Sequence, residues 1–229
     1  LLVTLLGQAR TACLDLVGKQ FGVPVATLLG GVVRDRVPYS AYLFYKYEGA
    51  GGDLAFSIDP KATGWAAARQ AAALDPEGVV AQARAMVAEF GFQSIKLKGG
   101  CFPPDQEVAA MKALQKAFPG YPLRLDPNAL WTVETSIKWG KELEGVLEYF
   151  EDPCRSQEGM ATARRALKMP FATNMCTTSF EDLPGSAQHG SEDIILTDHH
   201  FWGGLRASME LAAHCRIFGR GVSMHSNNH

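Results

Sequence analysis

A lysine, three carboxylates, an asparagine and a histidine end six short apolar runs in this chain, at intervals of roughly 25 residues, about one strand-plus-helix unit. The run ends are Lys98, Asp126, Glu151, Asn174, Asp198 and His225. In a (β/α) barrel every strand delivers its C-terminal residue to the same rim, so we expect these groups to converge. Basic side chains beside a set of oxygen ligands are suited to metal-assisted proton abstraction.

The two carboxylates and the amide form the candidate metal site. Asp126, Glu151 and Asn174 offer hard oxygen ligands from three consecutive strands, which suit Mg²⁺. Taken singly, Asp126 could merely begin a turn and Glu151 could pair with a lysine. Asp152 and Glu158 are acidic alternatives, and both rank below Glu151 because they follow the strand end.

Lys96 and Lys98 alternate with apolar residues and therefore point to one face of their strand. Inside a barrel, two ammonium groups near a metal lower each other's pKa, and one lysine can then act as a base. A solvated amphipathic strand is the plain alternative. The following Gly99-Gly100 pair favours the site, because it lets the backbone turn tightly at the strand end.

His225 and Asp198 end the last two runs and predict a histidine base oriented by a carboxylate. Ser226, Asn227 and Asn228 follow His225, where short polar side chains suit a polyhydroxylated ligand. The other histidines are expected to be surface or packed residues, with His189 in a loop, His214 on a helix face, and His199 and His200 after a strand end.

Composition and motifs exclude several classes of function. The 229 residues carry a net charge of −2, which provides no basic surface for nucleic acid or lipid. No apolar run reaches the roughly 18 residues of a membrane span. No GxSxG elbow, GxGxxG loop or P-loop is present. Five scattered cysteines indicate reduced thiols in a cytoplasmic protein.

Strands and helices are expected to alternate along the chain. Residues 1–33 predict a helix and a turn, 37–45 the first of seven strands, and 46–64 a Gly-rich loop that could close over the strand ends. Asp75 is the expected N-cap of the next helix, with Pro76 at its first position. Further helices are expected over 104–118, 133–145, 158–168, 180–189 and 204–218.

The chain resembles the enolase superfamily, in its mandelate-racemase-like branch, and within it the glucarate dehydratases. The matching stretches are VATLLGG (25–31), AYLFY (41–45), KLKGG (96–100), LDPNALW (125–131), FEDPC (150–154), ATNM (172–175), DHHFW (198–202) and SMHSNNH (223–229). The resemblance implies an α/β fold with an enolase-type barrel. Residues 1–33 would be the last part of an N-terminal capping domain, and 34–229 a catalytic barrel that ends before its eighth strand.

The resemblance also implies a role for each matching residue. Lys98 and His225 would act as bases on opposite faces of the substrate, with Asp198 paired to His225. Lys96 would support Lys98 and contact the substrate carboxylate. The implied Mg²⁺ ligands are Asp126, Glu151 and Asn174, and the implied substrate contacts are Tyr42, Lys96, Asn128, Ser226 and Asn227.

The expected activity is that of a Mg²⁺-dependent acid-sugar dehydratase acting on D-glucarate or a close aldarate. A proton next to the carboxylate leaves to give an enediolate, and a β-hydroxyl is then eliminated. The alternatives are a dehydratase or epimerase for another sugar acid, a noncatalytic homologue, and an aldolase-type barrel with a Schiff-base lysine. We expect a small-molecule partner and a homo-oligomer, with no nucleic acid or membrane partner.

Overall fold

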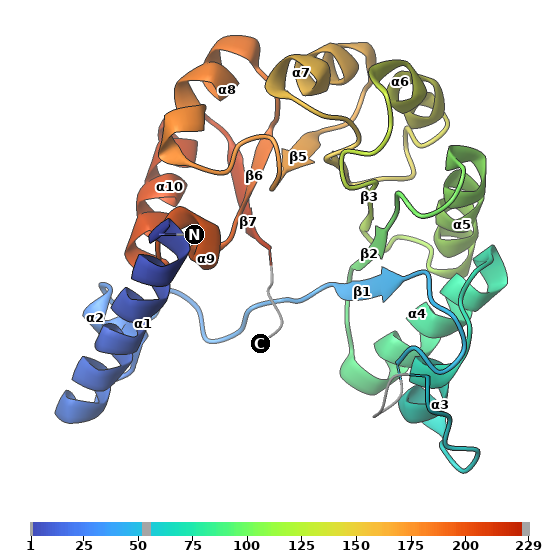
Figure 1. Ribbon diagram of the computed structural model, residues 1–229, viewed down its shortest axis with the longest axis horizontal. Coiled ribbons are helices and arrows are strands. Elements are labelled where there is room, and N and C mark those ends of the chain that lie inside the picture. Colours follow the sequence, from blue (N-terminus) through green and yellow to red (C-terminus); the bar gives the residue numbers. More distant parts are fainter. Residues whose placement is uncertain (1, 52–55, 226–229) are drawn as a thin grey trace. The chain divides into compact units, whose positions relative to one another are not determined.

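The computed structural model describes residues 2–51 and 56–225, in which strands and helices alternate along the chain (Figure 1). Neighbouring strands pair in parallel. The strands are β1 (Ala41–Phe44), β2 (Ile95–Lys98), β3 (Leu123–Asp126), β4 (Tyr149–Glu151), β5 (Phe171–Thr173), β6 (Ile194–Thr197) and β7 (Gly221–Met224). All seven lie within the runs that the sequence predicts.

Helices follow the strands, and α4, α6, α7 and α9 begin at a side-chain N-cap. Asp75 accepts a hydrogen bond from the Gly78 N–H at 2.7 Å, which confirms it as an N-cap. The helices are α1 (Leu2–Phe21), α2 (Val25–Leu28), α3 (Gly64–Gln70), α4 (Pro76–Phe90), α5 (Pro104–Ala117), α6 (Val133–Lys141), α7 (Gln157–Ala166), the 3₁₀ turn η1 (Phe180–Asp182), α8 (Leu183–His189), α9 (His199–Trp202) and α10 (Leu205–Ile217).

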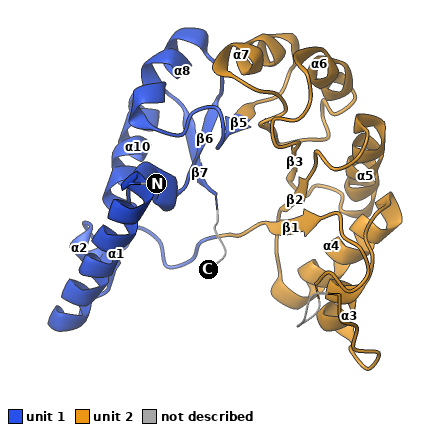
Figure 2. Cartoon of the chain, viewed as in Figure 1, with its two compact units in different colours: residues 1–37, 172–229 blue, residues 38–171 orange. Residues whose placement is uncertain are grey.

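The chain divides into two compact units (Figure 2). One unit comprises residues 38–171 and contains β1, β2, β3 and β4 in that order. The other comprises residues 1–37 and 172–229 and contains β6, β7 and most of β5. These units are defined by packing, so the division at residue 33 into capping domain and barrel stays a prediction.

The core of the 38–171 unit is built from the apolar residues that alternate with the polar ones along each strand. Leu43, Ile95, Leu97, Leu125 and Phe150 are fully buried. Each such side chain contributes about 1.5–3 kcal/mol to folding. Because alternate residues face opposite ways, the strands that bury these side chains under the helices direct their lysines and carboxylates to the other face.

The core of the second unit lies between β6 and its helices. Leu183, Ile195, Trp202, Leu211 and Cys215 form one buried cluster. At the opposite end of the strands from His225, the buried Glu192 pairs with Arg220 at 2.7 Å. This pair lies at the starts of β6 and β7, away from the predicted catalytic residues.

Two features differ from the sequence predictions. His189 is the last residue of α8 rather than a loop residue. The short helices α3 and α9 were not predicted, and neither is long enough to show a clear period.

The Gly-rich segment is anchored at its first residue, because the Lys46 ammonium donates to the carbonyls of Ala68, Arg69 and Ala71 at the end of α3. In the described part of the chain, no helix has both the length and the apolar character to cross a membrane.

Candidate active site

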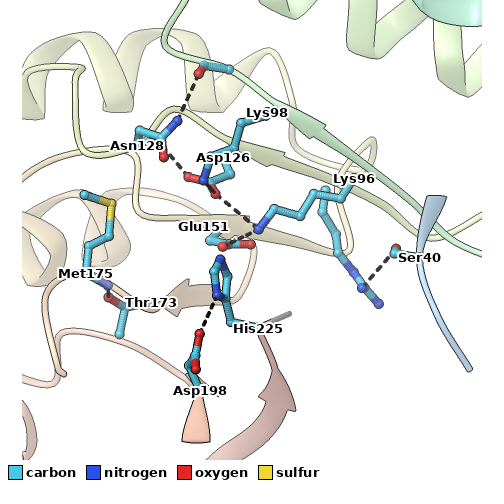
Figure 3. A network of polar contacts seen from close by, with 12 residues as sticks. Ser40, Lys96, Lys98, Asp126, Asn128, Glu151, Thr173, Met175, Asp198 and His225 are labelled. Carbon is cyan, nitrogen blue, oxygen red and sulfur yellow. Dashed lines mark hydrogen bonds and ion pairs between the residues drawn. The ribbon is translucent and has the colours of Figure 1, made fainter. Parts of the chain in front are cut away.

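Two lysines and two buried carboxylates form the centre of the site in the 38–171 unit (Figure 3). The Lys96 ammonium donates to Glu151 Oε1 and lies 3.1 Å from Asp126 Oδ2. The Lys98 ammonium donates to the same Asp126 oxygen at 2.5 Å. Both lysines therefore reach one face, as their alternation in the sequence predicts.

Strand register explains why these four residues meet. In the β2–β3 pair, Lys96 is level with Arg124 and Lys98 is level with Asp126. In the β1–β2 pair, Tyr42 is level with Lys96, and the Lys96 ammonium lies 5.0 Å from the centre of the Tyr42 ring. Tyr42 thus lies beside the cluster, and the substrate contact that the family resemblance implies for it stays a prediction.

Burial and ion pairing shift the pKa of both carboxyl groups, in opposite directions. Burial raises the pKa of Glu151 to about 8, although Lys96 opposes the shift. Burial also acts to raise the pKa of Asp126, but the two lysines and the Asn128 N–H outweigh it, so that pKa is lowered. Burial lowers the pKa of Lys96, and the charges of Glu151 and Asp126 more than reverse this, so its net shift is upward.

The loop after β3 positions a further predicted residue. Asn128 has a φ of 56°, a left-handed conformation that asparagine tolerates better than most residues. Its N–H donates to Asp126 Oδ1 at 2.9 Å and its side-chain amide donates to the Gly99 carbonyl at 3.3 Å. One of the two N–H groups of the Asn128 amide is therefore used within the protein, where it links the loop after β3 to the turn after β2.

The 172–229 unit carries the histidine and its carboxylate. His225 Nδ1 lies 3.0 Å from Asp198 Oδ2, and the His225 N–H donates to the Thr197 carbonyl at 2.8 Å. Asp198 Oδ1 accepts from the His200 N–H at 2.9 Å and lies 3.0 Å from His200 Nδ1. With Nδ1 held by the carboxylate, the other ring nitrogen of His225, Nε2, is the one placed to exchange a proton.

Hydrogen bonding keeps Asp198 ionised despite its burial. Burial acts to raise the pKa of Asp198, but the hydrogen bonds from His225 and His200 lower it further than burial raises it.

The carboxyl group of Asp198 and the rings of His199 and His200 also lie close enough to one another to hold a metal ion. The sequence analysis predicts no metal-binding role for these two histidines.

The remaining predicted residues have different environments. Asn174 follows β5 directly, and the chain turns there because Thr173 Oγ1 accepts the N–H groups of Met175 and Cys176 at 3.2 and 2.8 Å. Glu151 is fully buried, whereas its alternative Glu158 is exposed on the first turn of α7. Ser226, Asn227 and Asn228 lie outside the described residues.

The Glu151 side chain fits a cation site. Its Oε2 atom is buried and accepts no hydrogen bond from the described residues. A buried carboxylate oxygen without a partner costs about 1–3 kcal/mol, so this atom calls for a donor or a positive charge. Asp126 and Glu151 both contact the Lys96 ammonium and are therefore neighbours. Their carboxylates are the hard oxygen donors that Mg²⁺ selects.

Comparison with known proteins identifies the class to which this fold and these residues belong. Residues 78–229 match the family model described as "Enolase C-terminal domain-like", and the chain belongs to this family. It is 53% identical over 220 residues to a probable glucarate dehydratase of Streptomyces coelicolor, covering 96% of this chain and 49% of that protein. An L-talarate/galactarate dehydratase of Salmonella typhimurium is 27% identical over 92% of the chain.

Solved structures agree with this assignment. An enolase from Thermobispora bispora, complexed with magnesium and formate, is 52% identical and matches with a TM-score of 0.89 over 99% of this chain and 51% of its own. An enolase from Mycobacterium smegmatis, complexed with tartrate, is 51% identical with a TM-score of 0.88. The fold is therefore part of an enolase-type (β/α) barrel. The chain spans about half the length of the relatives it matches.

Proposed function

We propose that the protein to which this chain belongs is a Mg²⁺-dependent acid-sugar dehydratase, with D-glucarate or a close aldarate as substrate. The observation that carries the proposal is the cluster at the ends of β2, β3 and β4, in which Lys96 and the half-buried Lys98 pair with the buried carboxylates of Asp126 and Glu151. The similarity to a probable glucarate dehydratase supports the choice of substrate. The magnesium in the related enolase structure supports the choice of metal.

In this proposal Asp126, Glu151 and Asn174 hold the metal, which supplies positive charge that stabilises an enediolate when bound. Lys96 lies beside Asp126 and Glu151 and would neutralise the substrate carboxylate. Its ammonium is fixed by two carboxylates, so it keeps its place without reorganising during the reaction.

Lys98 Nζ and His225 Nε2 are the proposed proton-transfer atoms. One base removes the proton next to the substrate carboxylate, and the β-hydroxyl then takes a proton and leaves as water. The enol that remains tautomerises to a keto-deoxy acid, so all atoms of substrate appear in the product and in one water. Asp198 holds the His225 ring in the tautomer that leaves Nε2 free to accept.

The direct test is turnover of a panel of aldarates and aldonates by the intact protein with Mg²⁺. We expect glucarate to yield a semicarbazide-reactive keto acid and EDTA to abolish the reaction. Release of keto acid from another acid sugar alone would reassign the substrate and keep the reaction class. Interconversion of two epimers without loss of water would identify an epimerase instead.

A second test separates the two bases. In Lys98→Ala, solvent deuterium exchange should be lost from one substrate epimer, while His225 continues to exchange the proton of the other. The variant should lower that exchange at least roughly 100-fold, because general base catalysis contributes about that much. Equal exchange of both epimers in Lys98→Ala would contradict the two-base assignment.

A further inference from the structure

A buried glutamate lies directly behind the turn that follows Lys98. Glu107 is on the first turn of α5 and its exposed fraction is 0%. Its Oε1 atom accepts the backbone N–H groups of Cys101 and Phe102 at 2.8 and 3.0 Å. A charged acceptor makes hydrogen bonds roughly twice as strong as a neutral one, so a single side chain fixes the backbone of this turn.

The same turn packs against the loop that carries Asn128. The Gly99 N–H donates to the Asp126 carbonyl at 2.8 Å, and the Gly99 carbonyl accepts from the Asn128 side chain. A Cβ atom at Gly99 would lie 2.6 Å from Glu107 Oε2, and one at Gly100 would collide with the Pro127 carbonyl. A side chain at Gly99 would therefore displace the Glu107 carboxylate, and Gly100 needs glycine both for its positive φ and for its close approach to the β3 loop.

Glu107 is not explained by a stabilising ion pair. Among the described residues, the Oε2 atom of Glu107 has no hydrogen-bond partner, and neither does the buried hydroxyl of Tyr45. The centre of the Tyr45 ring lies 4.8 Å from that of Phe102, so the tyrosine packs against the same turn. Burial raises the pKa of Glu107, while the N–H groups of residues 100–102 oppose the shift. A buried, unpaired carboxylate costs stability, so the turn that it holds is the feature that accounts for it.

We propose that Glu107 is a positioning residue: by fixing the turn 99–102 against the β3 loop, it places the Lys98 ammonium and the Asn128 amide in the site. The inference rests on the proposed function only in what those two groups then do. Its structural part, the fixing of the turn by one carboxylate, is independent of any substrate. Sequence reasoning missed this residue because an acidic side chain in the first turn of a helix ordinarily signals a favourable helix dipole contact.

The test compares Glu107→Gln with Asp105→Asn, which makes the same charge change at an exposed position of the same helix turn. In Glu107→Gln the amide protons of Cys101 and Phe102 should exchange with solvent about tenfold faster, because the bonds lose their charge. Acetic anhydride should also acetylate the Lys98 ammonium several-fold faster than in wild type, whereas the rate at Lys112, an exposed lysine of α5, should not change. Asp105→Asn should change neither rate, and unchanged exchange in Glu107→Gln would overturn the proposal.

The functional part is tested with substrate. Glu107→Gln should lower kcat roughly 10- to 100-fold for the proton exchange that depends on Lys98, as expected of a displaced catalytic group, and leave the His225-dependent exchange within about twofold. Equal loss of the Lys98-dependent and the His225-dependent exchange would indicate a general loss of structure and would contradict the positioning role. If the wild-type protein exchanges no acid-sugar proton, the proposed function fails, whereas the amide and acetylation rates still decide the role of Glu107.

The variant Glu107→Asp covers the case in which Glu107→Gln does not fold. The aspartate side chain keeps the charge but is one methylene shorter, so its carboxylate lies farther from the turn. We therefore expect partial protection of the Cys101 and Phe102 amides from solvent exchange. Failure of both variants to fold, with Asp105→Asn folded, would assign Glu107 to stability alone and contradict the proposal.

Discussion

At the scale of single residues, Lys96 is the centre of the site because it lies between two carboxylates that are both fully buried. Taking these charges out of water is costly, and their mutual attraction recovers the cost only while every partner is present. Buried ion pairs are often no more stabilising than apolar residues of similar volume, so a gain in stability does not by itself account for this cluster. The proposed binding of an anionic substrate and a cation would account for it.

Replacing the Lys96 ammonium tests that argument. Lys96→Met should lower the free energy of unfolding by about 3–5 kcal/mol, because Glu151 and Asp126 would be left buried without their shared cation. The matched variant Lys112→Met breaks an exposed pair with Glu142 and should cost less than about 1 kcal/mol. Urea unfolding in EDTA measures both. Equal, small losses would show that the cluster is not electrostatically coupled.

At the scale of elements, the strand ends could be predicted and the loops behind them could not. Short apolar runs that end on a polar residue at regular spacing predict β2, β3 and β4, and the alternation within β2 places Lys96 and Lys98 on one face. The pairing of Lys98 with Asp126 depends on strand register, which the sequence does not specify without a turn between the strands. The helices α3 and α9 are too short for periodicity to indicate them.

The loop after β5 depends on a side chain that patterns alone did not single out. Asp182 Oδ2 accepts the N–H groups of Thr178 and Ser179, both at 2.9 Å, and with Ser179 forms a capping box at the start of η1. This carboxylate thereby joins the segment that follows Asn174 to α8. Such a bond is a local stabilisation of the loop rather than part of the core.

Removing the charge of Asp182 should reveal a pH-dependent effect. Burial acts to raise its pKa, but the hydrogen bonds from Thr178 and Ser179 lower it below the ordinary 3.8. A lowered pKa means that the stabilisation is present above the unfolded value and is lost as pH falls through the folded value. Asp182→Asn should therefore cost about 1 kcal/mol at pH 7, and the difference from wild type should disappear in acid.

Urea midpoints measured from pH 7 down to pH 3 check this prediction. Glu181→Gln, an exposed neighbour with the same charge change, serves as the control and should stay close to wild type throughout. A gap between wild type and Asp182→Asn that does not change with pH would contradict the role of the ionised carboxylate.

At the scale of the whole molecule, the chain supplies the predicted bases and ligands from two compact units. The 38–171 unit contains the lysines with Asp126 and Glu151, and the other contains Asn174 and the Asp198–His225 pair. Each unit has its own buried residues. Ligand binding couples to stability wherever the ligand prefers the folded form, which makes the metal a reporter on the residues that hold it.

Magnesium should therefore stabilise the intact protein through Glu151 and not through Glu158. Saturating Mg²⁺, at about 100 times its dissociation constant, adds roughly 2.7 kcal/mol and should raise the midpoint of thermal unfolding by roughly 5 to 10 °C relative to EDTA. Glu151→Gln should lose most of this shift, because an amide in place of the buried carboxylate removes a charged ligand. Glu158→Gln should keep it, because that side chain is exposed on α7. The midpoints with Mg²⁺ and with EDTA are compared within each variant, so any change in metal-free stability cancels. If the Mg²⁺-induced shift were lost in Glu158→Gln and kept in Glu151→Gln, Glu158 rather than Glu151 would be the metal ligand.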